Sequence, residues 1–126
     1  VSGREVVPSF QVEAWRSAAD AGWLLWLLFA IIVVAPVGEE VIFRGFLFRG
    51  LAKPGWEVHA IGAIALAWAL LHIQYDWVGT AQIFLAGLAL GWFRWASGST
   101  LLTIAMHILI NLQSMIETWI KLEYFS

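Results

Sequence analysis

The chain has 126 residues, of which 61% are hydrophobic and 13% are charged, and its net charge is −2. This composition is too apolar for an ordinary soluble domain, and the charge offers no basic surface for nucleic acid. Because the chain contains no cysteine, a thiol nucleophile, a disulfide framework and a cysteine-ligated metal site are all excluded.

Four long segments carry no Asp, Glu, Lys or Arg. They are residues 21–38, 58–75, 77–93 and 95–116. Each is close to the ~20 residues that a helix needs to span a bilayer. We therefore predict an all-α integral membrane protein, a bundle of about four transmembrane helices with the lipid bilayer as its partner.

The expected elements follow in chain order. Residues 1–20 mix charged residues with short apolar patches and are expected to form an interfacial lead-in before a membrane core at residues 21–126. The first span begins near Ala21, and we expect a kink or interruption at Pro36-Val37-Gly38 before a helix resumes to about Leu51. The later helices are expected at residues 58–73, 77–96 and 100–120.

Two adjacent carboxylates and a guanidinium lie within the first of these apolar regions, as Glu39, Glu40 and Arg44. A charge at the centre of a membrane helix costs roughly 2.5–3.5 kcal/mol on insertion scales, so such groups usually face a protected interior and mark function. Glu40 and Arg44 form an i,i+4 pair in the favourable order, whereas Glu39 lies about 100° round the helix from Glu40. The simplest allocation pairs Glu40 with Arg44 and leaves Glu39 free for chemistry.

Other polar residues are expected to reach the same depth. The helix at residues 100–120 carries a single polar stripe at spacings of four, four and three, formed by Thr103, His107, Asn111 and Ser114. With a rise of ~1.5 Å per residue, four side chains lie at overlapping depths of ~11–21 Å from one membrane face, namely Glu39, His72, His107 and Asn111. The sequence therefore predicts one buried polar site.

The residue types in this site suit hydrolysis. A carboxylate beside a histidine can take a proton from water and make it a nucleophile. A second imidazole N–H and a carboxamide, four residues apart on one helix, can donate to a developing oxyanion. Together these groups can hydrolyse a carbonyl compound without a covalent intermediate.

The same residues resemble the signatures of a known family. The run Pro36-Val-Gly-Glu39-Glu40-Val-Ile-Phe-Arg44-Gly-Phe-Leu47 resembles the EExxxR signature of the CPBP intramembrane glutamic endopeptidases, also called the CAAX protease or Abi family. Trp68-Ala-Leu-Leu-His72 resembles the FxxxH signature, with Trp at the Phe position, and His107 with Asn111 resembles HxxxN. The match covers about Pro36 to Leu112, so the chain resembles the conserved core of the family.

The resemblance implies an all-helical membrane endopeptidase, with the protease core at residues 21–126 and no cofactor. By motif position, Glu39 would activate the water with the assistance of His72. His107 and Asn111 would stabilise the oxyanion, and Glu40 and Arg44 would support the site. The substrate would be a peptide or a prenylated protein, and the location would be the cell membrane of a prokaryote.

Two other catalytic interpretations remain open at this stage. Glu39, His72 and His107 could form a metal-ligand set with an open position, as in zinc hydrolases, although the chain has no HExxH motif. In a rhomboid-like serine protease, Ser97 or Ser99 would be the nucleophile and His107 the base, but these serines are predicted at the membrane edge.

A protein without catalytic activity is the alternative from a different class. It would be a membrane scaffold or a bacteriocin-immunity protein that keeps the fold, or a small transport subunit with a polar relay. Intramembrane acids and histidines do mark ion pathways. However, the polar residues here cluster at one depth instead of continuing to both faces, which favours the enzyme.

Overall fold

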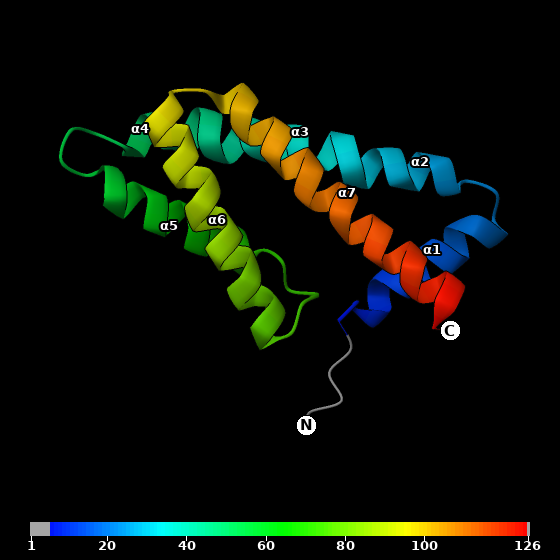
Figure 1. The fold of residues 1–126 in the computed structure, drawn as a ribbon. Helices are drawn as coiled ribbons and strands as arrows, with labels where there is room; N and C mark the ends of the chain where they lie inside the picture. Colours follow the sequence, from blue (N-terminus) through cyan, green and yellow to red (C-terminus); the bar gives the residue numbers. More distant parts are fainter. Residues whose placement is uncertain (1–5, 126) are drawn as a thin grey trace.

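The computed structural model describes residues 6–125 of the chain, and the secondary structure of this part is helical (Figure 1). The elements are α1 (Ser9–Asp20), α2 (Leu24–Phe29), η1 (Ala30–Val34), α3 (Ala35–Glu40), η2 (Val41–Leu47), α4 (Phe48–Leu51), α5 (Glu57–Leu70), α6 (Trp77–Ser97) and α7 (Thr100–Tyr124). The all-α prediction is confirmed for these residues, and the three later helices begin within one residue of the expected positions.

One long helix runs from Leu24 to Leu51 and consists of α2, η1, α3, η2 and α4 in succession. The interruption expected at Pro36 and Gly38 is therefore wrong, because the chain stays helical through both residues. Pro36 is tolerated because it lies in the first turn of α3, directly after the π-helical turn η1. A second π-helical turn, η2, carries Arg44.

Among the described residues, two helical segments are long and apolar enough to cross a membrane, Leu24–Leu51 and α7. The helix α5 is apolar but shorter. Large side chains on the outside of the protein are apolar as well, and Leu25, Phe46 and Leu101 are at least three-quarters exposed. Such a surface is expected against lipid. The full set of four spans stays a prediction.

The helices α5 and α6 pack closely because α6 has glycines at the contact. A Cβ atom added at Gly87 would lie 3.0 Å from Cβ of Ala65, and one added at Gly91 would lie 2.9 Å from Cγ2 of Ile61. The absence of a side chain at these two positions therefore allows the close approach of the two helices. This close pair forms one side of the fold (Figure 1).

The helix α7 lies against η1, α3 and η2 of the long helix and also against α6. The short helix α1 precedes the long helix and lies near the C-terminal half of α7 (Figure 1). The three main bodies, which are the long helix, the α5–α6 pair and α7, therefore converge at η2, next to α3. The interfacial location of residues 1–20 stays a prediction.

Candidate active site

A cavity of about 430 Å³ opens where these bodies converge, and it is lined by residues of α1, the long helix, α5, α6 and α7 and by the connection between α5 and α6. All four side chains that the sequence predicts to be catalytic line it, namely Glu39, His72, His107 and Asn111. The structure thus brings together residues that are up to 72 positions apart in the chain. Their roles stay a prediction.

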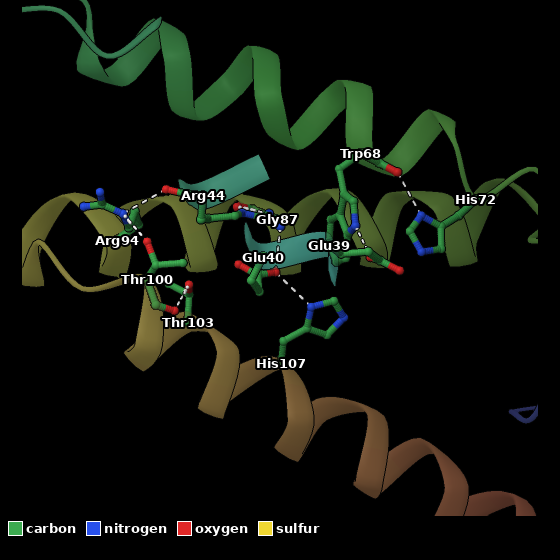
Figure 2. A network of polar contacts seen from close by, with 10 residues as sticks. All are labelled: Glu39, Glu40, Arg44, Trp68, His72, Gly87, Arg94, Thr100, Thr103 and His107. Carbon is green, nitrogen blue, oxygen red and sulfur yellow. Dashed lines mark hydrogen bonds and ion pairs between the residues drawn. The ribbon is translucent and has the colours of Figure 1, made fainter. Parts of the chain in front are cut away.

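The second glutamate of the pair lies at the centre of a buried ion-pair cluster (Figure 2). Glu40 Oε1 accepts hydrogen bonds from Arg44 Nη1 at 2.9 Å and from His107 Nδ1 at 2.8 Å. Arg44 Nη2 also donates to the carbonyl of Gly87 at 3.2 Å, so the cluster joins η2 to α6 and α7. The exposed fractions of Glu40 and Arg44 are 0% and 1%, and the predicted pairing of these two residues is confirmed.

The contact with Glu40 also fixes the orientation of the His107 ring. A carboxylate can only accept, so His107 Nδ1 carries the proton of this hydrogen bond. His107 is 3% exposed but still lines the cavity. Because Nδ1 is occupied, Nε2 is the ring nitrogen available to a substrate. A neutral His107 would present Nε2 as an acceptor, and an imidazolium would present it as a donor.

A second buried arginine, Arg94 of α6, supports the cluster from behind. Arg94 Nε donates to the carbonyl of Arg44 at 2.9 Å and to Thr100 Oγ1 at 3.1 Å (Figure 2). Its guanidinium carbon lies 5.1 Å from the ring centroid of Phe48. Arg94 therefore connects the end of α6 to η2 and to the start of α7.

The first glutamate of the pair has different surroundings. Glu39 is half-buried and lines the cavity, and Glu39 Oε2 accepts a hydrogen bond of 2.5 Å from Trp68 Nε1 (Figure 2). The Trp68 ring lies edge-on to both histidines, with centroid distances of 5.0 Å to His72 and 5.2 Å to His107. Arg44 Cζ lies 4.6 Å from the centroid of the same indole. Trp68 thus contacts Glu39 and His72 as well as the buried cluster of Glu40, Arg44 and His107.

His72 follows the end of α5 and is held by its own helix. Its Nδ1 lies 2.8 Å from the carbonyl oxygen of Trp68, four residues earlier. Since a carbonyl oxygen only accepts, Nδ1 carries the proton, and Nε2 is left with a lone pair. His72 lines the cavity, so this arrangement presents a proton acceptor there.

Asn111 is positioned by a carbonyl of the long helix. In the π-helical turn η1, the N–H of Ala35 donates to the carbonyl of Ala30, five residues earlier. The next donor in this pattern would serve Ile31, but Pro36 has no N–H. Asn111 Nδ2 donates to the Ile31 carbonyl at 2.8 Å in its place. The amide has a second N–H, and Asn111 lines the cavity.

Trp68 and Arg94 are two residues of the site that were not predicted from the sequence. A signal existed for Trp68, because its indole N–H lies in an apolar helix and needs an acceptor there. Arg94 also had a signal, since it is a charged residue between two apolar segments of the chain. Neither signal names the partner, because the partners lie on other helices.

In the described residues, the geometry matches neither the metal-site interpretation nor the serine-protease interpretation. Within residues 6–125, no group of three or more His, Cys, Asp or Glu side chains is placed to hold a metal ion. Ser97 Oγ donates to the carbonyl of Phe93, and the Ser99 hydroxyl caps α7 by accepting from the N–H of Leu102. Ser97 is the last residue of α6 and Ser99 directly precedes α7, and neither serine lines the cavity.

Comparison with known proteins identifies the family of the chain. The family model described as type II CAAX prenyl endopeptidase Rce1-like matches residues 21–113. The chain belongs to this family. The resemblance inferred from the three motifs is confirmed, since the matched range contains all of them. Proteins of the Rce1-like family are embedded in membranes, in agreement with the two apolar helices Leu24–Leu51 and α7.

A curated relative covers part of the same range. The chain is similar to an uncharacterized 24.3 kDa protein of Escherichia coli, with 32% identity over 84 residues. The aligned part is 64% of this chain and 39% of that protein, so the chain spans about two fifths of its relative's length. No solved structure matches the chain.

Proposed function

We propose that the chain is the core of an intramembrane endopeptidase that uses a glutamate-activated water. The observation that carries this proposal is the shared cavity, which is lined by a half-buried carboxylate, two histidines and a carboxamide. Membership of a family of prenyl endopeptidases supports peptide-bond hydrolysis as the reaction.

The proposed reaction begins with a water molecule beside Glu39. The Glu39 carboxylate takes a proton from the water while the water oxygen forms a bond with the peptide carbonyl carbon. The electron pair of the carbonyl moves onto its oxygen and gives an oxyanion. His72 assists, since its Nε2 can accept a hydrogen bond from the same water. The intermediate collapses when the C–N bond breaks, and the leaving amine takes the proton back from Glu39.

The oxyanion needs donors, and His107 and Asn111 are the proposed ones. In the proposed step His107 acts as an imidazolium, which keeps Nδ1 on the Glu40 carboxylate and donates to the oxyanion through Nε2. Asn111 donates through the N–H that is not bonded to Ile31.

The proposed substrate is a peptide or a prenylated protein of the CAAX type, reached within the bilayer. The family description supports this substrate class, and the bacterial relative supports the cell membrane of a prokaryote as the location. The bond that is cleaved is the peptide bond whose carbonyl carbon lies next to the water activated by Glu39.

The test is cleavage of a quenched-fluorescent farnesylated CAAX peptide by the protein reconstituted in liposomes. We expect cleavage by the wild type, loss of cleavage in Glu39→Gln and no effect of a strong chelator. Loss of activity on chelation would replace the glutamate mechanism with a metal-dependent one. Absence of cleavage with this peptide and with unprenylated peptides of matched length would favour the non-catalytic scaffold.

A further inference from the structure

A second cavity, of about 420 Å³, adjoins the candidate active site on the side of α1. It is lined by residues 6–9, before and at the start of α1, and by Asp76 and Glu117, none of which lines the active-site cavity. Seven residues line both cavities, and Phe10, Gln11, Tyr75 and Ser114 are four of them. These shared residues mark the junction between the outer cavity and the active-site cavity.

Side chains from three parts of the chain meet at this junction. Gln11 Nε2 donates to the Tyr75 hydroxyl at 3.2 Å and to Ser114 Oγ at 3.1 Å. Gln11 Oε1 accepts from Thr118 Oγ1 at 3.1 Å. Beside it, the rings of Phe10 and Tyr75 pack edge to face with centroids 5.0 Å apart. One glutamine therefore joins α1 both to α7 and to the connection between α5 and α6.

These contacts are an appreciable part of what holds α1 in place. Ala18 is the one residue of α1 that is fully buried, and Phe10, Val12 and Trp15 are half-buried, so polar contacts add to a partly buried apolar face. Thr118 is 0% exposed, and its hydroxyl lies 3.1 Å from Gln11 Oε1 and 2.9 Å from the carbonyl oxygen of Ser114. Elements with few buried apolar contacts open at low free-energy cost, and each lost hydrogen bond lowers that cost further.

Burial also keeps the Tyr75 hydroxyl in its neutral form. The burial of this side chain, in the connection between α5 and α6, raises the pKa of Tyr75, and the hydrogen bond from Gln11 opposes part of that rise. A neutral phenol accepts from Gln11 across the whole range of physiological pH. The contact therefore does not depend on a titration near neutrality.

Part of the junction lies outside the range matched by the family model. The family match covers residues 21–113, whereas α1, Ser114 and Thr118 lie before or after it. The catalytic candidates belong to the matched part, and two thirds of the residues that bind Gln11 do not.

We propose that α1 closes the passage between the outer cavity and the active-site cavity, and that Gln11 determines how readily water and substrate reach Glu39. The passage opens when Gln11 releases its partners and α1 moves away from α7. The inference deepens the proposed function by assigning an entry-controlling residue, but the opening itself can be measured without any hydrolysis.

The experiment uses the absence of cysteine from the chain. Ala86 is half-buried and lines the active-site cavity but not the outer one, so Ala86→Cys places a single thiol on the active-site side of the junction. The rate of its modification by a water-soluble methanethiosulfonate reagent is measured in the full chain in liposomes, with and without Gln11→Leu. We expect Gln11→Leu to raise the rate about tenfold, because leucine keeps the bulk of the side chain and removes every hydrogen bond of the amide.

Two controls separate opening from unfolding. Gln113→Leu is the matched control, because it makes the same change on α7 at an exposed glutamine that bonds to Glu117, and it should leave the rate unchanged. A thiol at Ala69, which is 1% exposed within α5, should stay unreactive in the Gln11→Leu protein. If it reacts, Tyr75→Phe decides the question, since it removes one hydroxyl and should raise the Ala86→Cys rate about threefold.

The modification rates decide whether Gln11 controls entry to the active-site cavity. A faster rate at Ala86→Cys with an unreactive Ala69→Cys supports control of entry by Gln11, even if the protein cleaves no peptide. An unchanged rate in Gln11→Leu and in Tyr75→Phe overturns it, even if the protein is an active protease. In an active protein, Gln11→Leu should also raise kcat/KM, because entry becomes easier.

Discussion

The two adjacent glutamates of the chain have opposite surroundings. Glu40 is completely buried and is bonded to Arg44 and His107, which are both candidates for positive charge. Glu39 is half-buried, faces a cavity and accepts a hydrogen bond from the neutral indole of Trp68. A rotation of about 100° round one helix therefore separates a carboxylate that holds the fold together from one that can meet water.

The strongest way to sharpen this comparison is Glu39→Gln. We expect kcat to fall roughly 1,000-fold, because glutamine keeps the shape and cannot take a proton from water. The unfolding free energy should change little, since Glu39 faces the cavity. Peptide cleavage and detergent-based unfolding measure the two quantities. Glu123→Gln, at an exposed site on α7, is the control, and an active Glu39→Gln protein would remove Glu39 from its proposed role.

Glu40→Gln, the same substitution one residue later, should lower the free energy of unfolding. Glu40→Gln leaves the buried Arg44 guanidinium without its counter-charge, and we expect a loss of about 3 kcal/mol in unfolding free energy. The measurement is the shift of the unfolding transition relative to Glu39→Gln. Equal stabilities of the two variants would contradict the division between a structural and a catalytic glutamate.

Asn111→Ala tests the cavity side at a third position. We expect kcat to fall about 100-fold while KM stays within about a factor of two, because an oxyanion donor acts mainly in the transition state. Steady-state kinetics with one peptide gives both values. Gln113→Ala, on the exposed side of the same helix, is the control. A change confined to KM would mean that Asn111 binds the peptide instead.

Trp68→Phe should give the smallest effect, about a fivefold decrease in kcat. The ring contacts with His72 and His107 are kept, whereas the hydrogen bond to Glu39 is lost, so the carboxylate is held less firmly. Trp92→Phe, at a half-exposed position of α6, is the control. If Trp68→Phe and Trp92→Phe have the same activity, the indole N–H has no part in positioning Glu39.

Much of the fold could be predicted from the sequence, because helices that span a membrane consist of long uncharged segments that are visible in the sequence. The starts of α5, α6 and α7 were expected within one residue. The interruption at Pro36 was not observed, because a first-turn position and a preceding π-helical turn accommodate proline without ending the helix. Local sequence shows the proline, but not the register of the helix around it.

The candidate site could be predicted in part for a related reason. The pairing of Glu40 with Arg44 follows from helical spacing within one element. The contact of His107 with Glu40, and that of Trp68 with Glu39, join different helices. Such contacts depend on the rotation of each helix about its axis, which the spacing of residues in one helix does not determine.

The sequence by itself determined the helical class, the family and the four side chains of the proposed reaction, because hydrophobic segments and the three motifs are local properties. Only the tertiary structure decided which atoms remain for chemistry. It bonded Nδ1 of both histidines and left their Nε2 atoms free for other partners. It also gave Asn111 the carbonyl that Pro36 leaves without a donor, and it placed Gln11 between the two cavities. Hydrogen bonds between distant segments form only where packing brings donor and acceptor within about 3 Å, and that packing is a property of the whole fold.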